Sequence, residues 1–154
     1  MRPLRVVGKL CLNSRPPACM PALSFRCSDV KSQLPTSGKV ILVVEDEFLI
    51  AMELESMLEG GGYKVLGPAT TVAAALAFLA HHRPDACVLD FNLRGEHVTP
   101  VARVLKAEGV PFLLSSAYEQ VKFDGDAAFN GAINIGKPAS REHLFATLDM
   151  ILKT

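Results

Sequence analysis

The strongest constraint on the fold is a regular alternation of apolar runs and amphipathic segments between residues 40 and 153. The apolar runs, which predict strands, are 40–44, 63–69, 85–90, 110–116 and 132–137. Helical patterns with apolar residues three or four positions apart occupy 47–62, 72–82, 98–109, 119–131 and 140–153. Such alternation is typical of a parallel sheet with helices on both faces. The predicted fold is therefore α/β, a doubly wound five-stranded parallel sheet.

The length of the chain helps to decide between an open sheet and a closed barrel. A closed eight-stranded barrel takes about 250 residues, and the whole chain has 154. An open sheet therefore fits better than a barrel. No apolar run approaches the roughly 20 residues of a membrane span, so we expect no membrane association. In open sheets of this kind, ligands bind at the carboxyl ends of the strands, near the point where the strand order reverses.

The segment 47–62 predicts an amphipathic helix that ends at a run of glycines. Its apolar positions are 48, 49, 52, 54, 57 and 58, with acidic residues between them. Apolar positions at this spacing are expected on the buried face of a helix. The segment 119–131 is a weaker helix prediction, because Asp124 and Gly125 interrupt it.

Residues 1–38 differ from the rest of the chain. They hold six basic residues and one acidic residue, whereas residues 39–154 hold ten basic and fifteen acidic residues. Pro, Ser and Gly occur there at irregular spacing, which predicts a disordered extension before a domain at 39–154. A targeting peptide, or an upstream translation start with the working protein beginning near Lys39, would have the same composition.

The cysteines indicate a reducing setting. Cys11, Cys19 and Cys27 lie in the N-terminal extension at a spacing that fits neither a disulfide framework nor a close metal-binding pair. Cys87 lies within an apolar run and is expected to be a small core residue. We therefore expect a cytoplasmic protein.

Polar residues follow the predicted strands at the points where they end. Glu45 and Asp46 follow the first strand, Asp90 ends the third, Ser116 ends the fourth and Lys137 ends the fifth. Because parallel strands present their carboxyl ends at one edge of a sheet, these side chains are expected to converge. The carboxylates repel one another, and a divalent cation would offset that repulsion. Mg²⁺ is the natural candidate, because it prefers oxygen ligands and bridges carboxylates to phosphates.

A purely structural explanation of the acidic residues also exists. Acidic side chains that follow a strand can simply start a helix, whose N-terminus favours negative charge. Glu47 fits this explanation. It does not account for Asp90, Ser116 and Lys137 at the ends of three other strands.

Four motifs, "ILVVEDE", "CVLDFNLRG", "VPFLLSSA" and "GKPAS", resemble the receiver domain of two-component response regulators, a flavodoxin-like (βα)5 fold. The resemblance covers residues 39–154 in order and is greatest to small stand-alone bacterial receivers. It implies that Asp90 is the phosphoacceptor. It also implies that Asp46 binds Mg²⁺ directly, that Glu45 binds it directly or through water, and that Asn92 contributes its backbone carbonyl.

The resemblance further implies how the phosphoryl group is held. Lys137 would pair with its oxygens, Ser116 would donate a hydrogen bond from its hydroxyl, and Pro138 would follow a cis peptide bond. Asn134 stands where many receivers have an aromatic residue, and Arg94 stands where a proline is usual. These departures predict that the region around 110–137 reorganises by loop ordering rather than by rotation of a ring.

Asn92 and Tyr118 occupy positions that, in the family, govern how fast water removes the phosphoryl group.

The expected function is that of a phosphorelay receiver that signals by protein contact. Its partners would be a histidine kinase or a histidine phosphotransfer protein, with a target protein besides, and no nucleic acid. We expect no DNA-binding output domain, a monomer or weak dimer, and no enzymatic activity beyond its own phosphorylation and dephosphorylation.

Two alternatives remain open. A haloacid-dehalogenase-like phosphatase also uses an Asp nucleophile and Mg²⁺, but it needs a second Asp two residues later, where this chain has Asn92. A degenerate receiver could serve as an unphosphorylated scaffold, which Asn134 mildly favours and the complete set of acids, hydroxyl and lysine opposes.

Overall fold

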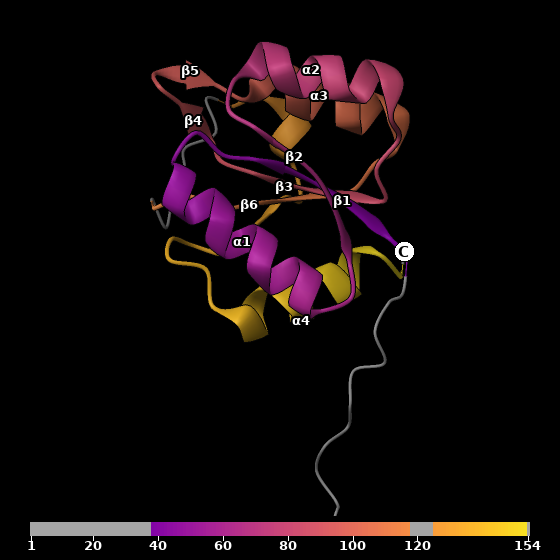
Figure 1. Ribbon diagram of the computed structural model, residues 1–154. Coiled ribbons are helices and arrows are strands. Elements are labelled where there is room, and N and C mark those ends of the chain that lie inside the picture. The colour runs from indigo at the N-terminus through magenta and orange to yellow at the C-terminus, as the bar shows by residue number, and fades with distance from the viewer. Residues whose placement is uncertain (1–37, 118–124, 154) are drawn as a thin grey trace, which may run out of the picture. The chain divides into compact units, whose positions relative to one another are not determined.

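The computed structural model describes residues 38–117 and 125–153, which form a five-stranded parallel sheet between two layers of helices (Figure 1). The strands lie in the order β2-β1-β3-β6-β7. Their bounds are β1 Val40–Val44, β2 Lys64–Ala69, β3 Ala86–Leu89, β6 Phe112–Leu114 and β7 Ile133–Asn134. The helices are α1 Phe48–Gly60, α2 Val72–His81, α3 Thr99–Glu108 and α4 Arg141–Ile151. The predicted doubly wound, flavodoxin-like α/β fold is confirmed.

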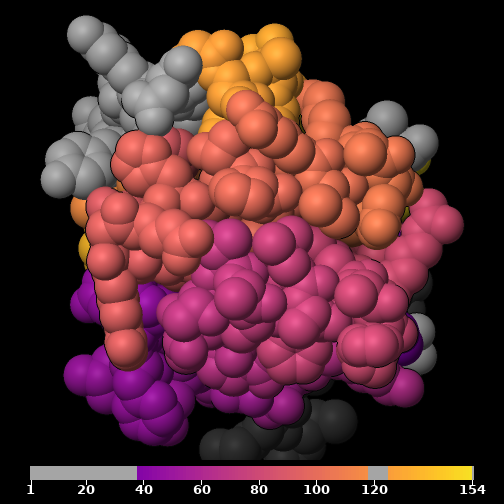
Figure 2. Space-filling model, turned by 90° about the horizontal axis from the view of Figure 1, so that it is seen from above, coloured from indigo at the N-terminus to yellow at the C-terminus, as the bar shows by residue number. Residues whose placement is uncertain are grey.

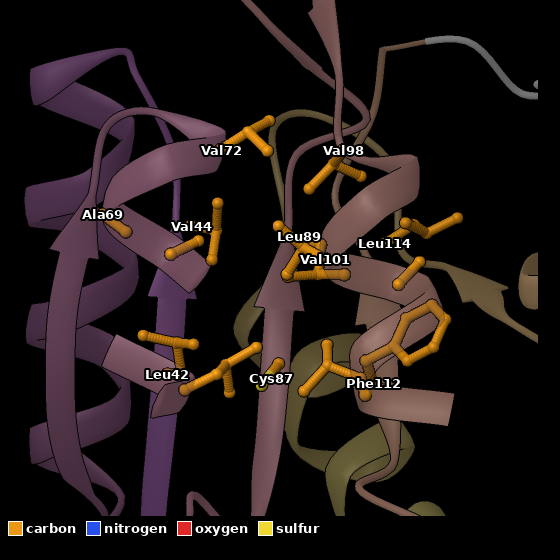
Figure 3. Packing of buried hydrophobic residues seen from close by; sticks show 14 of the residues in the cluster. Leu42, Val44, Ala69, Val72, Cys87, Leu89, Val98, Val101, Phe112 and Leu114 are labelled. Carbon is orange, nitrogen blue, oxygen red and sulfur yellow. The ribbon is translucent and has the colours of Figure 1, made fainter. Parts of the chain in front are cut away.

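Alternate residues of the central strands point to opposite faces of the sheet, and this divides the core into two clusters. Leu42, Cys87 and Phe112 point toward the layer of α2 and α3 (Figure 3). Ile41 and Val88 point the other way and pack with residues of α1 and α4. Figure 1 shows these two pairs of helices on opposite faces. Because both faces are covered, the central strands are continuous apolar runs rather than alternating ones.

Cys87 is a core residue, as its place in an apolar run predicts. Its side chain is fully buried, and the thiol is free. Burial raises the pKa of the Cys87 thiol well above its ordinary value. Since the thiolate is the reactive form, this cysteine is chemically inert in the folded protein.

The prediction of which apolar residues of the first helix are buried is partly wrong. The buried side chains of α1 lie three and four positions apart, at Ala51, Leu54 and Leu58. Three other apolar side chains are exposed, namely Phe48 at 72%, Leu49 at 79% and Met52 at 50%. The sequence pattern overestimated the buried stripe because a helix that packs on a sheet along one narrow line leaves adjacent apolar positions in solvent.

Side-chain caps fix the starts of two helices. Thr71 accepts a hydrogen bond from the backbone N–H of Ala74 at the start of α2, and Ser140 accepts one from His143 at the start of α4. Such caps satisfy N–H groups that have no partner within the helix. None of the helices in residues 38–117 and 125–153 has both the length and the apolar character needed to cross a membrane.

A short antiparallel hairpin, which the sequence pattern did not predict, follows β3. It consists of β4 Asn92–Leu93 and β5 Glu96–His97. The two turn residues, Arg94 and Gly95, both have positive φ angles, of 53° and 91°, as the common two-residue hairpin turn requires. The hairpin lies at the border of the face formed by α2 and α3, beside the purple segment that follows β1 (Figure 2).

The last strand is shorter than the predicted range 132–137. Strand β7 ends at Asn134, and the chain then turns at Gly136, whose φ is 78°. Lys137 therefore lies in the turn after the strand. The peptide bond between Lys137 and Pro138 is cis, as the family resemblance implied.

The predicted helix 119–131 is described only in part. Residues 119–124 and Tyr118 lie outside the described residues. Within 125–131 the chain forms a short 3-10 helix, η1 Ala127–Phe129, rather than a turn of α-helix. Its first residue is preceded by Asp126, whose carboxylate accepts a hydrogen bond from the N–H of Ala128 at 2.9 Å.

Replacing Gly67 by Ala is expected to destabilise the fold more than the same replacement at an ordinary loop glycine. Gly67 has a φ of 105°, and an added Cβ would lie 2.7 Å from the carbonyl oxygen of Val43. Left-handed backbone and a clash with rigid backbone act together, so we expect a loss of about 3 kcal/mol in the free energy of unfolding. Urea denaturation followed by circular dichroism measures it.

Gly109→Ala is the matched control for Gly67→Ala. Gly109 ends α3 with a φ of 67°, but an added Cβ there meets no atom within 4 Å. Backbone strain alone should cost about 1 kcal/mol. Equal losses in the two variants would contradict the clash at Gly67.

Candidate functional site

Hydrogen bonds between strands place two acidic residues side by side at the edge of the sheet. Val44 and Leu89 are partners in neighbouring strands β1 and β3. The backbone N–H of Asp90 donates to the carbonyl of Val44 at 2.8 Å, and that of Glu45 donates to Ala69 at 3.0 Å. Because β1 is flanked by β2 on one side and β3 on the other, this is the point where the strand order reverses, where such folds bind ligands.

The ammonium group of Lys137 joins the carboxylates of Asp90 and Glu45. Its Nζ lies 2.8 Å from Asp90 Oδ2, 3.0 Å from Glu45 Oε1 and 2.8 Å from Glu45 Oε2. Burial alone would lower the pKa of the Lys137 ammonium, but the hydrogen bonds to Asp90 and Glu45 outweigh it and raise that pKa. Lys137 is therefore positively charged at neutral pH.

Glu45 is a fully buried carboxylate. Burial raises the pKa of its carboxyl group, against the opposing effect of hydrogen bonds from Lys137 and from the backbone N–H of Glu47. Only Oε1 is hydrogen-bonded, because the close approach of Lys137 to Oε2 lacks hydrogen-bond geometry. The Lys137 ammonium, 2.8 Å from Oε2, nevertheless gives this buried oxygen an opposite charge.

The carboxylates of Glu45, Asp46 and Asp90 form a group that can hold a cation. Each offers an oxygen atom, and these atoms lie within 4.8 Å of one another. Three hard oxygen donors suit Mg²⁺. The residues present therefore fit the metal that the sequence predicted.

Arg94, which stands where receivers usually have a proline, is a charged neighbour of this group. Its Nε lies 3.8 Å from Asp46 Oδ2, and its side chain is 72% exposed. The hairpin turn holds it there, since Asn92 Oδ1 accepts a hydrogen bond from the N–H of Gly95 at 2.7 Å. Asn92 also donates its backbone N–H to Asp90 Oδ1 at 3.4 Å.

Ser116 lies beyond the end of β6, the strand that pairs with β3. Ser115, the residue before it, donates its backbone N–H to the carbonyl of Leu89 at 2.8 Å. Ser116 itself is buried, and its backbone N–H donates to the side chain of Asn134 at 3.1 Å. The structure thus brings Glu45, Asp46, Asp90 and Lys137 into direct contact or close approach, and it places Ser116 after the adjacent strand.

Comparison with known protein families identifies the domain. The family model of the "Response regulator receiver domain" matches residues 41–149. The chain is 32% identical over 115 residues to the phyllosphere-induced regulator PhyR of Methylorubrum extorquens, an alignment that covers 73% of this chain and 43% of PhyR. The chain spans about half the length of the curated relatives it matches.

Solved structures give the same picture. The solution structure of SdrG from Sphingomonas melonis Fr1 has 39% sequence identity and a TM-score of 0.64, with 74% of this chain and 96% of SdrG covered. A putative response regulator from Chloroflexus aurantiacus has 28% identity and a TM-score of 0.67, with 77% of this chain and all of that chain covered.

Replacing Lys137 by Met should destabilise the fold through Glu45. The substitution removes the ammonium group and leaves a buried carboxylate with a hydrogen bond from the N–H of Glu47 only. Breaking one partner of a buried ion pair costs about 3 kcal/mol. The free energy of unfolding in urea, measured with EDTA present to exclude divalent cations, tests this expectation.

Two further variants make the cause of that loss measurable. Adding Glu45→Gln to Lys137→Met removes the unpaired charge and should recover more than half of the loss. Lys64→Met, at an exposed lysine of β2, should change stability by less than about 0.5 kcal/mol. A double variant no more stable than Lys137→Met alone would show that the Glu45 charge is not the cause.

Proposed function

The chain belongs to the response regulator receiver family, and from this premise we propose that Asp90 accepts a phosphoryl group from a phosphohistidine on a partner protein. The observation that carries the proposal is the contact between Asp90 Oδ2 and the Lys137 ammonium at 2.8 Å, beside two further carboxylates. A carboxylate held next to a fixed positive charge and a cation site is suited to become an acyl phosphate.

In the proposed transfer, each side chain at the end of the sheet has a chemical role. An oxygen of the Asp90 carboxylate attacks the phosphorus, a P–O bond forms, and the P–N bond to the imidazole breaks with its electron pair left on the nitrogen. Lys137 neutralises charge on the phosphoryl oxygens, and the buried Ser116 donates its hydroxyl to one of them. Phosphoryl transfer needs little more than such positioning and charge cancellation.

We propose that Mg²⁺ completes the site, held by Glu45, Asp46 and Asp90 together with the backbone carbonyl of Asn92. When bound, the ion supplies charge neutralisation to the phosphoryl oxygens. Arg94, 3.8 Å from Asp46, offers that carboxylate a positive charge.

We propose that a histidine kinase or a histidine phosphotransfer protein docks on the exposed apolar start of α1. Phe48, Leu49 and Met52 are exposed in the first turns of α1, shortly after Asp46 in the chain. Another face of α1 borders a cavity of about 330 Å³ between this helix and the turn that carries Lys137, lined in part by Ile50, Met57 and Pro138. An apolar surface beside the phosphoacceptor suits a partner that must bring its histidine to Asp90.

We propose that the domain signals by protein contact, since the exposed apolar side chains of Phe48, Leu49 and Met52 offer a surface to a partner protein. A cytoplasmic setting is proposed with it, since the free Cys87 thiol suits a reducing compartment.

Incubation with acetyl phosphate and Mg²⁺ tests the phosphoacceptor directly. The wild-type chain is expected to gain the mass of one phosphoryl group, measured on the intact protein, while Asp90→Asn and the wild type in EDTA gain none. A phosphorylated Asp90→Asn variant would move the acceptor elsewhere. An unphosphorylated wild type that still folds would favour the scaffold alternative, and steady hydrolysis of p-nitrophenyl phosphate would favour the phosphatase.

Replacing Leu49 by Lys tests the docking surface. The phosphoryl donor in this assay is a histidine kinase or phosphotransfer protein of the same genome. The one that phosphorylates the wild-type chain fastest is used. Because the leucine side chain would be buried in the complex, its loss should slow phosphoryl transfer about tenfold or more. Phosphorylation by acetyl phosphate should be unchanged, because that small donor needs no surface.

Met150→Lys is the matched control for Leu49→Lys, since Met150 is 53% exposed on the last turns of α4. It should leave both rates unchanged. Equal slowing by the two variants would mean that added charge, rather than the start of α1, affects transfer.

A further inference from the structure

The side chain of Asn134 connects the two segments that carry Ser116 and Lys137. Its Oδ1 accepts hydrogen bonds from the backbone N–H of Ser116 and of Gly136, both at 3.1 Å. Its Nδ2 donates to the backbone carbonyl of Ser116 at 3.4 Å. The opposite orientation of the amide would turn its NH₂ group toward two N–H donors, so the hydrogen-bond network itself defines which atom is the oxygen.

These hydrogen bonds of the Asn134 side chain lie where the backbone pairing of β6 and β7 ends. Leu114 pairs with Asn134 in the ladder, and the N–H of Ile135 donates to the carbonyl of Leu114 at 2.8 Å. The chain then turns at Gly136, whose φ is 78°. The Asn134 carboxamide presents one acceptor and one donor to Ser116, as a paired residue of a strand would.

We infer that Asn134 is a positioning residue that holds the backbone of Ser116 at a fixed place relative to Gly136 and Lys137. The hydroxyl and the ammonium group then reach the phosphoryl group as one preformed unit. An aromatic side chain at this position could not accept the two N–H groups, which would lose hydrogen bonds in a partly buried region. The inference rests on the proposed function for its consequence at Asp90, but the hydrogen bonds can be tested without it.

Hydrogen exchange of the unphosphorylated full chain tests the hydrogen bonds. In Asn134→Ala, the backbone amides of Ser116 and Gly136 are expected to exchange about tenfold faster or more than in the wild type, as followed by NMR. In Asn134→Asp, which keeps the acceptor oxygen and loses the donor, both amides should stay protected.

Asn130→Ala is the matched control, because Asn130 is exposed and the hydrogen bond it accepts from Lys106 uses its backbone carbonyl. It should leave the exchange of Ser116 and Gly136 unchanged. Unchanged exchange in Asn134→Ala would overturn the inference, and so would a general rise in exchange along β3, which would mean that the variant loosens the whole sheet.

A double-mutant cycle then tests whether Asn134 acts through Ser116. In the wild-type background, Asn134→Ala should slow phosphorylation by acetyl phosphate about tenfold. In a Ser116→Ala background, the same substitution should have little further effect, because the hydroxyl it positions is gone. Independent, multiplying effects of the two substitutions would overturn the positioning role.

The two proposals can fail separately. A wild-type chain that gains no phosphoryl group overturns the proposed function, while protection of the Ser116 and Gly136 amides still tests the hydrogen bonds of Asn134. A wild-type chain that is phosphorylated normally, with Asn134→Ala equally fast, overturns the positioning role and leaves the phosphoacceptor intact.

Discussion

The site depends on one ammonium group that faces two carboxylates from neighbouring strands. Lys137 meets Asp90 and Glu45 at the end of β3 and β1, and Glu45 is completely buried. Burying an isolated carboxylate is very costly, so the lysine is a condition for placing Glu45 there at all. The same arrangement that lets the sheet edge tolerate negative charge also holds the Asp90 carboxylate next to a positive charge.

The fold and the residues that make up the acidic group could be predicted from the sequence for a simple physical reason. Parallel strands that are covered on both faces must be apolar throughout, so polar residues such as Asp90 and Glu45 become visible as soon as a strand ends. Once the strands are recognised, their carboxyl ends must meet at one edge. Neither step requires knowledge of side-chain conformation, and this is why both could be made from the order of residues alone.

The features that the sequence did not predict depend on how the chain turns and packs. The hairpin that holds Arg94 near Asp46 arises from two positive φ angles, one of them at a residue other than glycine. The exposure of Phe48 and Leu49 depends on which line of α1 touches the sheet. The bonds of Asn134 required the turn at Gly136, which shortened the predicted strand. Each is a matter of local geometry that periodicity does not encode.

The two-sided core gives the sheet a property beyond stability. Each residue of the central strands contributes to one cluster only. Cys87 and Phe112 belong to one cluster (Figure 3), and Ile41 and Val88 belong to the other. A change in the packing of one helix layer therefore passes to the other through the strands that both layers share.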